Sequence, residues 1–205
     1  MSSKIQNLLK QAAEQAESST VEASSVTSAT RIFSAETEVG NVFRRLKRKI
    51  FHIEKWNSES GLSKFALFDE NGSAQMEKIA AVGDFIRITL PGSGKNDWVK
   101  IVEIYDTSDE IVLTVQPSLD PTDKEDKSAT SHFFTNDSTN NFCLQKTGIK
   151  LNFYVVGLGE KSNTEDTSGV VETVRNFATA NISHLLGIQK AQWQTFCENF
   201  IEVEE

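Results

Sequence analysis

The sequence predicts an α+β fold in which a curved antiparallel β-sheet of about six or seven strands wraps a long C-terminal helix. Two observations support this prediction. Between Phe65 and Val156, apolar residues recur at every second position in short segments, which is the period of a strand with one buried face. From Val170 to Val203 they recur at spacings of three and four residues, which is the period of an amphipathic helix. The 205 residues are enough to bury a sizeable core.

The first segment, residues 1–17, is predicted to form a short amphipathic helix that Ser2 or Ser3 can cap. Its apolar face is weak because alanine buries little area. We therefore expect this helix to pack on the edge of the domain, to contact a partner chain or a second copy, or to fray. The remaining residues, 18–205, are predicted to form one α+β domain. The apolar face of the helix consists of Ile5, Leu8, Leu9, Ala12 and Ala16.

A second helix is predicted after a strand over residues 26–33. Ser34 is placed to cap this helix, and acidic residues in its first turn complement the helix dipole. A basic run from Arg44 to Lys49 follows. The chain carries a net charge of −8 and the run contains no aromatic residues, so we interpret it as a solvated helix face rather than a nucleic-acid site. The buried stripe is expected to be Val39, Val42, Phe43, Leu46, Ile50 and Ile53.

The strand-like segments follow this helix. In the clearest of them, Ile86, Ile88 and Leu90 are predicted to share one face. Residues 117–131 contain two prolines and several carboxylates, which is typical of an exposed acidic loop inserted into the sheet. The predicted strands are 65–68, 85–90, 98–105, 111–115, 142–145 and 151–156, the last two forming a hairpin across residues 146–148.

Two segments resemble ligand-binding loops but lack required residues. Gly92-Ser-Gly94-Lys95 lacks the first glycine and the final Ser or Thr of a phosphate-binding P-loop, and it precedes a strand instead of a helix. The carboxylates between Asp120 and Asp126 lack the spacing and the central glycine of a calcium-binding EF-hand loop. We therefore predict neither a metal site nor a bound cofactor.

The histidines and cysteines give no catalytic signature. None of the three histidines lies three or four residues from another histidine or a cysteine, as a helical metal pair would require. A pairing of His132 with Ser131, Asp137 or Cys143 stays open, because no spacing selects one of them. We therefore assign no catalytic residue.

Charge and composition exclude several classes of partner. The chain has 21 Lys and Arg against 29 Asp and Glu, which opposes nucleic-acid binding and docking on anionic membranes. Its apolar runs are too short for a membrane span, and its first residues lack the pattern of a signal peptide. Cys143 and Cys197 lie far apart and form no redox or zinc motif. These features predict a soluble, cytoplasmic protein.

Two stretches, Arg31 to Val39 near the start of the domain and Gly187 to Ile201 at its end, together resemble the START-like, or SRPBCC, helix-grip superfamily. Arg31-Ile-Phe-Ser-Ala35, which runs directly into Glu36-Thr-Glu-Val39, is similar to the first strand and first helix of that family, with Trp56 near the end of the helix pair. The segment from Gly187 to Phe196, followed by Phe200-Ile201, is similar to its closing helix. The resemblance covers roughly residues 24–203 and leaves the N-terminal helix outside.

The resemblance implies an apolar cavity gripped between the sheet and the C-terminal helix, and it implies non-catalytic binding of a small hydrophobic ligand such as a lipid. The many phenylalanines and tryptophans could line such a cavity. Two alternatives remain: a protein-interaction module with a filled core and an exposed apolar patch, or a cyclase- or hydrolase-type enzyme on the same fold. The implied cavity walls are Ile182, Leu186 and Trp193 on the helix, and Ile88, Ile101 and Phe153 on the sheet.

Overall fold

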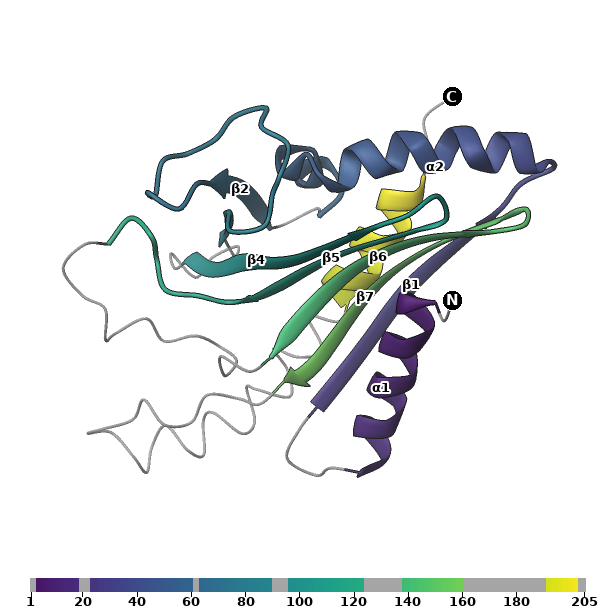
Figure 1. Cartoon of the computed structure of the whole chain (residues 1–205), viewed down its shortest axis with the longest axis horizontal. Coiled ribbons are helices and arrows are strands. Elements are labelled where there is room, and N and C mark those ends of the chain that lie inside the picture. The colour runs from purple at the N-terminus through teal and green to yellow at the C-terminus, as the bar shows by residue number, and fades with distance from the viewer. Residues whose placement is uncertain are drawn as a thin grey trace.

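The computed structural model describes residues 3–18, 23–60, 63–89, 96–123, 138–160 and 191–202. Its elements are arranged as one sheet with helices on both faces (Figure 1). In chain order they are α1 (Lys4–Ser18), β1 (Ala23–Ile32), α2 (Glu36–Ile50), the 3-10 helix η1 (Ile53–Ser58), β2 (Lys64–Phe68), β3 (Phe85–Thr89), β4 (Asn96–Asp106), β5 (Glu110–Pro117), β6 (Thr139–Thr147), β7 (Lys150–Glu160) and a C-terminal helix whose described part covers residues 191–201.

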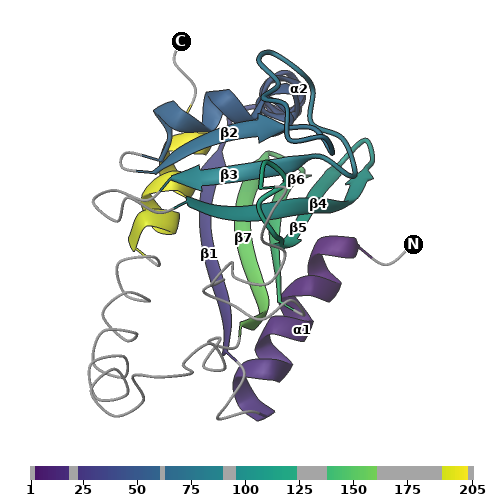
Figure 2. The same cartoon turned by 90° about the vertical axis from the view of Figure 1, so that its left-hand side faces the viewer.

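Within these residues, seven strands form one antiparallel sheet in the order β1-β7-β6-β5-β4-β3-β2. Because β1 and β2 lie at opposite edges, α2 and η1 must cross the width of the sheet to connect them. The face that packs against α2, η1 and the C-terminal helix is called the inner face, and the face that packs against α1 is called the outer face (Figure 2). The predicted fold class, a sheet wrapped on a C-terminal helix with a further N-terminal helix, is confirmed. Residues 170–190 of the predicted long helix lie outside the described residues.

The second helix forms as predicted over most of its length. Val39, Phe43, Leu46 and Ile50 are buried on its inner stripe. Two details of the prediction were wrong. Ser34 does not cap the helix, because the chain is still extended at Ala35, which takes the N-cap position without a side-chain bond. Ile53 is buried, but it belongs to η1, since α2 ends at Ile50 and the chain tightens into a separate 3-10 turn.

The strands alternate as predicted, and most of them are longer than the periodic segments. Ile86 is buried and Ile88 is partly buried against the same core cluster, which confirms their shared face. The β6–β7 hairpin is also confirmed: Thr147 pairs with Lys150, and Gly148 adopts a positive φ of 54° in the turn. A register shift in β4 between Ile101 and Glu103 was not predicted, because a bulge adds one residue without changing composition.

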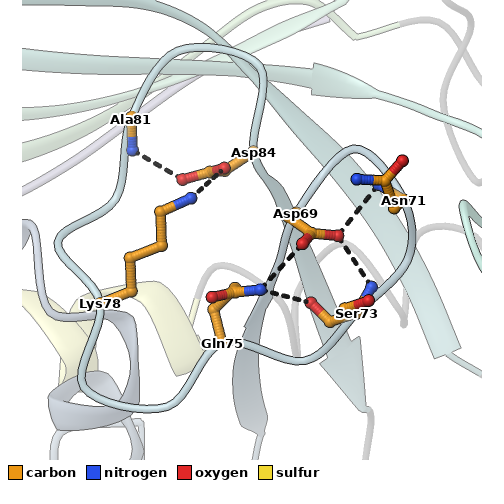
Figure 3. Close-up of polar contacts among 7 residues, drawn as sticks. All are labelled: Asp69, Asn71, Ser73, Gln75, Lys78, Ala81 and Asp84. Carbon is orange, nitrogen blue, oxygen red and sulfur yellow. Dashed lines mark hydrogen bonds and ion pairs between the residues drawn. The ribbon is translucent and has the colours of Figure 1, made fainter.

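The loop between β2 and β3, residues 69–84, is ordered by two carboxylates (Figure 3). The first is Asp69. One of its oxygens accepts the backbone N–H groups of Asn71 and Ser73, both at 2.9 Å, as in an Asx turn. The other accepts the side-chain amide of Gln75 at 2.9 Å. Asp69 therefore fixes the first half of a loop that the sequence indicated only as a turn.

The second carboxylate, Asp84, fixes the other half of this loop (Figure 3). It accepts Lys78 Nζ at 2.8 Å and the backbone N–H of Ala81 at 2.9 Å, and it is buried. The backbone N–H of Ala80 donates to the carbonyl of Phe51 at 2.8 Å, which joins the loop to the end of α2. The loop is thus held both internally and against the helix layer.

Gly72, in the same loop, provides a test of local packing. It has a φ of +74°, and a Cβ built there would lie 2.6 Å from the carbonyl oxygen of Pro121. We expect Gly72→Ala to lower the free energy of unfolding by about 1–2 kcal/mol for the left-handed backbone and by about 1–3 kcal/mol more for the clash. Urea denaturation measures the change.

Gly148→Ala is the matched control for this substitution. Gly148 also has a positive φ, but nothing lies within 4 Å of a Cβ added there. It should therefore show the backbone cost without the steric cost. Equal losses of stability in the two variants would contradict a close approach between the loop and Pro121.

Helix α1 packs on the outer face of the sheet against β1, β7 and β5, which include the edge strand β1. It is therefore docked on the domain along its buried residues and not frayed, and its contact with a partner chain stays a prediction. The predicted cap by Ser3 is confirmed, since its hydroxyl accepts the backbone N–H of Gln6 at 3.1 Å. Ala16 is exposed, so the apolar face is shorter than expected. The buried contact consists of Ile5, Leu8 and Ala12 on the helix against Val112, Cys143 and Val156 on the sheet.

A buried carboxylate on the sheet holds the first turn of α1. Glu110 accepts the backbone N–H of Lys4 at 3.0 Å, the hydroxyl of Ser3, and the side-chain amide of Gln145 at 2.8 Å. A negative charge at this position also complements the positive end of the helix dipole. Because the apolar side of α1 is used within the chain, any partner or second copy would have to contact the polar side of the helix.

Candidate functional site

The inner face carries a cluster of aromatic side chains that come from five different elements. Phe153 and Phe200 stack with ring centroids 4.2 Å apart and an interplanar angle of 15°. Trp56 lies 4.6 Å from Phe142 and 5.6 Å from Phe196, measured between ring centroids. We call this set the aromatic cluster: Trp56, Phe65, Phe142, Phe153, Trp193, Phe196 and Phe200.

The cluster joins the C-terminal helix to the sheet. Phe196 and Phe200 lie one helical turn apart on that helix, and both side chains pack into the inner core. Two polar contacts hold the helix at its sides. Gln194 donates its side-chain amide to the carbonyl of Ser28 on β1 at 3.2 Å, and Asn199 donates to the carbonyl of Glu59 beyond η1 at 2.9 Å. The described part of the helix is therefore fixed against one edge strand and against the helix layer.

The structure places four of the six predicted wall residues on this inner face. Ile101 and Phe153 are fully buried, and Ile88 and Trp193 are only partly buried. Ile88 pairs with Phe65 across the β2–β3 ladder, and the Phe65 ring lies 6.5 Å from the ring of Trp193. Ile88 and Trp193 thus lie at an end of the cluster that is only partly buried. The other two predicted wall residues, Ile182 and Leu186, lie outside the described residues, as do His132 and the acidic segment 124–131.

Trp56 was not predicted as a site residue. It lies in η1, where no helical or strand period marks which side chains are buried, and its position near the end of α2 was its only sequence signal. Among the described residues, three buried side-chain polar atoms lack a hydrogen-bond partner: Trp56 Nε1, Arg87 Nε and Ser118 Oγ. Trp56 belongs to the inner core. Arg87 lies opposite Trp98, and the guanidinium of Arg87 covers the ring of Phe68 outside that core.

Two lysines that lie over rings of the inner core, Phe200 and Phe43, are already paired with carboxylates. Lys49 Nζ lies 2.8 Å from Glu59 and also donates to the carbonyl of Phe200 at 3.3 Å. Lys146 Nζ lies 2.7 Å from Asp109. The hydrogen bond from Lys146 holds the pKa of the Asp109 carboxyl below its usual value. The described inner face is therefore apolar, with its nearby charges neutralised.

The two thiols are free and buried, one beneath α1 and the other on the C-terminal helix. Cys143 lies under α1 on the outer face, and Cys197 faces β1 from the C-terminal helix, with its sulfur 3.9 Å from the hydroxyl of Thr27. Burial raises the pKa of the Cys143 thiol far above its usual value and raises that of Cys197 to about 12. Both thiols are thereby kept in the unreactive, protonated form at neutral pH.

We expect both thiols to resist modification in the folded protein. Iodoacetamide at pH 8 should label neither Cys143 nor Cys197 within minutes, because the thiolate is the reactive form and each raised pKa lies well above pH 8. In guanidinium chloride both should react, which serves as the control. Peptide mass spectrometry identifies the labelled residue. Rapid labelling of either thiol in native buffer would show that its helix does not protect it.

No group of three or more His, Cys, Asp or Glu residues that could hold a metal ion occurs in the described ranges. No helix in the described part of the chain is both long and apolar enough to span a membrane.

Comparisons with known proteins find similar structures but no similar sequence. No protein-family model and no curated protein sequence matches the chain. A hypothetical protein from Helicobacter pylori is 9% identical with a TM-score of 0.49, and the match covers 86% of each chain. An uncharacterised protein from Bacillus thuringiensis is 13% identical with a TM-score of 0.42, over 88% of this chain and 100% of that one.

A third similar structure is the ginseng major latex-like protein 151 from Panax ginseng. It is 13% identical with a TM-score of 0.38, over 84% of this chain and 97% of that one. None of these three scores reaches 0.5. The helix-grip architecture is therefore assigned from the order and packing of this chain's own elements.

Proposed function

We propose that this protein binds a small apolar ligand without chemical conversion, between the inner face of the sheet and the C-terminal helix. The observation that carries the proposal is the aromatic cluster, which is fully buried at Phe153 and Phe200 and only partly buried at Trp193. Binding sites for small molecules are lined mostly by apolar and aromatic side chains, with few polar groups. The inner face has this composition.

In this proposal the ligand enters at the partly buried end of the cluster. Ile88 and Trp193 would contact it first, because they are the predicted wall residues that are still partly exposed. Ile101 and Phe153 would form the deeper part of the wall. Ile182 and Leu186 would complete the helix side. Release of water from these apolar surfaces supplies the free energy of binding.

Non-covalent binding fits the inner face better than catalysis does. An enzyme of the same fold needs a titratable group facing the ligand, with a pKa tuned to its task. Three described groups have a raised pKa. Cys143 and Tyr154 lie on the outer face beneath α1, and Cys197 lies in the inner core. Burial keeps that thiol protonated, which is the opposite of nucleophile activation.

Native mass spectrometry tests this proposal directly. The protein as purified is compared with the same sample after organic extraction, and a bound apolar mass that extraction removes supports the proposal. Titration of the extracted protein with small aromatic compounds should then change the fluorescence of wild type and of Trp98→Phe, and the change should be smaller in Trp193→Phe. The proposal would be overturned if the purified protein showed the mass of the chain alone and if lipids and aromatic compounds did not change its melting temperature.

A second candidate function, protein–protein interaction, is favoured by one specific surface. The ordered loop between β2 and β3 exposes 86% of Met76, 61% of Ile79 and 60% of Val82. Large apolar side chains on a loop fixed by Asp69 and Asp84 are typical of a contact surface. If the extraction experiment finds no ligand, Ile79→Ser with Val82→Ser is the first variant to compare with wild type for self-association by analytical ultracentrifugation.

A further inference from the structure

The indole N–H of Trp56 is a hydrogen-bond donor enclosed in the apolar interior. The side chain is fully buried, and its Nε1 has no acceptor among the described residues. Three of its neighbours in the aromatic cluster are Phe65, Phe142 and Phe196, at ring-centroid distances of 5.5, 4.6 and 5.6 Å. Phenylalanine offers no oxygen or nitrogen acceptor. An unpaired buried donor is rare in folded proteins, because it has lost its bond to water without replacement.

The polar groups around Trp56 are occupied. Asn57 exchanges two hydrogen bonds with the backbone of Phe65, at 3.0 and 2.7 Å. The hydroxyl of Ser60 donates to the carbonyl of Ser63. The carbonyl of Trp56 itself accepts the backbone N–H groups of Glu59 and Ser60, both at 3.1 Å. Of the three unpaired buried polar atoms in the described residues, the indole N–H of Trp56 is the one whose residue belongs to the inner core, where it is available to a bound molecule.

We propose that the ligand carries a neutral hydrogen-bond acceptor, such as the oxygen of a ketone, ester or ether, which accepts the indole N–H of Trp56. This inference rests on the proposed ligand-binding function and names the chemical class of the ligand. The proposed ligand is an apolar molecule that carries one oxygen acceptor. The bond would satisfy the donor and fix the orientation of a molecule that otherwise makes only non-directional contacts.

The acceptor is neutral because the described cations beside the inner core are already paired. Lys49 and Lys146, which lie over the rings of Phe200 and Phe43, are bound to Glu59 and Asp109. A carboxylate or phosphate buried there would lose its hydration and gain a single indole hydrogen bond, without a counter-charge. A carbonyl or ether oxygen loses far less hydration free energy than an anion does on leaving water, so it is the acceptor that this environment favours.

Solution NMR of the extracted, nitrogen-15-labelled protein tests this inference. The chain has three tryptophans, so three indole N–H signals are expected, and Trp56→Phe, Trp98→Phe and Trp193→Phe assign them. The probes are acetophenone, which has one carbonyl, and ethylbenzene, which matches its size without an acceptor. Acetophenone should move the Trp56 indole proton downfield, and ethylbenzene should not. The wild-type readout does not depend on the stability of any variant.

Affinities provide a second readout. Trp56→Phe keeps an aromatic ring but removes the donor. It should lower the preference for acetophenone over ethylbenzene by about fivefold, the value of one ordinary hydrogen bond. Trp98→Phe, outside the inner core, should leave the ratio unchanged. Benzoate, the anionic analogue, should bind more weakly than acetophenone.

The outcomes separate this inference from the proposed function. One outcome is that both probes bind while the Trp56 signal does not shift and Trp56→Phe keeps the wild-type preference for acetophenone over ethylbenzene. In that case the hydrogen-bond assignment is overturned and ligand binding stands. If benzoate binds more tightly than acetophenone, the neutral class is wrong. If neither probe binds and extraction releases no apolar mass, the proposed function itself fails.

Discussion

Replacing Phe200 by alanine is expected to lower the free energy of unfolding by about 3–5 kcal/mol, which is the usual cost of removing a buried phenylalanine ring. The ring is fully buried, stacks on Phe153 and contacts Phe196. It also lies 4.9 Å from Lys49 Nζ, measured to its centroid. Since it joins the C-terminal helix to β7, its loss should both destabilise the protein and loosen that helix. Urea denaturation measures the first effect.

Thiol labelling measures the second effect and identifies the helix that moves. Cys197 lies on the C-terminal helix and Cys143 lies beneath α1. In Phe200→Ala, iodoacetamide should label Cys197 faster while Cys143 stays protected. Phe200→Leu, which keeps most of the apolar volume, is the matched control. It should show a smaller loss of stability and a smaller rise in the labelling rate of Cys197. An alanine variant with wild-type stability and an unreactive Cys197 would show that the stacked pair does not hold the helix.

The elements that could be predicted from the sequence are those whose burial follows a period. Ile86 and Ile88 repeat at the strand period, and Val39, Phe43, Leu46 and Ile50 repeat at the helical one, so their shared faces follow from spacing alone. Element ends were less predictable. Ser34 is a good capping residue, yet the helix begins after Ala35, because Ala35 has an extended backbone and takes the N-cap position itself.

The candidate site could be predicted only where it lies on periodic elements. Ile101 and Phe153 are on strands whose alternation indicates which residues share a face, and both are buried. Trp56 lies in a 3-10 turn, and its contacts with Phe142 and Phe196 join segments that are far apart in the chain. Local sequence carries no signal for such contacts. The same limit applies to the unpaired indole N–H, which is a property of the packed interior.

The docking of α1 shows the same limit for a polar contact. Glu110 follows a turn and begins β5, so the sequence indicates an exposed charge. In the structure it is buried, and it accepts the backbone N–H of Lys4, which lies 106 residues away in the chain. The weak apolar face of α1 left open whether this helix packs on the edge of the domain, contacts a partner or frays. The carboxylate of Glu110 adds hydrogen bonds to the first turn of α1, and these supplement the contacts of its apolar face.

Replacing Glu110 by alanine is therefore expected to lower the free energy of unfolding by about 2–3 kcal/mol, because it leaves several donors without a partner and removes the charge that complements the helix dipole. The groups affected are the backbone N–H of Lys4, the Ser3 hydroxyl and the Gln145 amide. Glu110→Gln retains one acceptor oxygen and should lose less. Urea denaturation of the two variants gives the difference.

Labelling of Cys143 decides whether this loss of stability reflects undocking of α1. In Glu110→Ala, iodoacetamide should reach Cys143 while Cys197 stays protected, which is the reverse of the pattern expected for Phe200→Ala. Glu103→Ala is the matched control, since Glu103 also binds Lys4, through the ammonium group at 3.0 Å, but its side chain is 47% exposed. An exposed ion pair contributes about 0–1 kcal/mol, so this control should leave Cys143 protected. If Glu103→Ala exposed Cys143 as much as Glu110→Ala did, the anchor would be the surface ion pair, and the buried carboxylate would not be what holds α1 on the sheet.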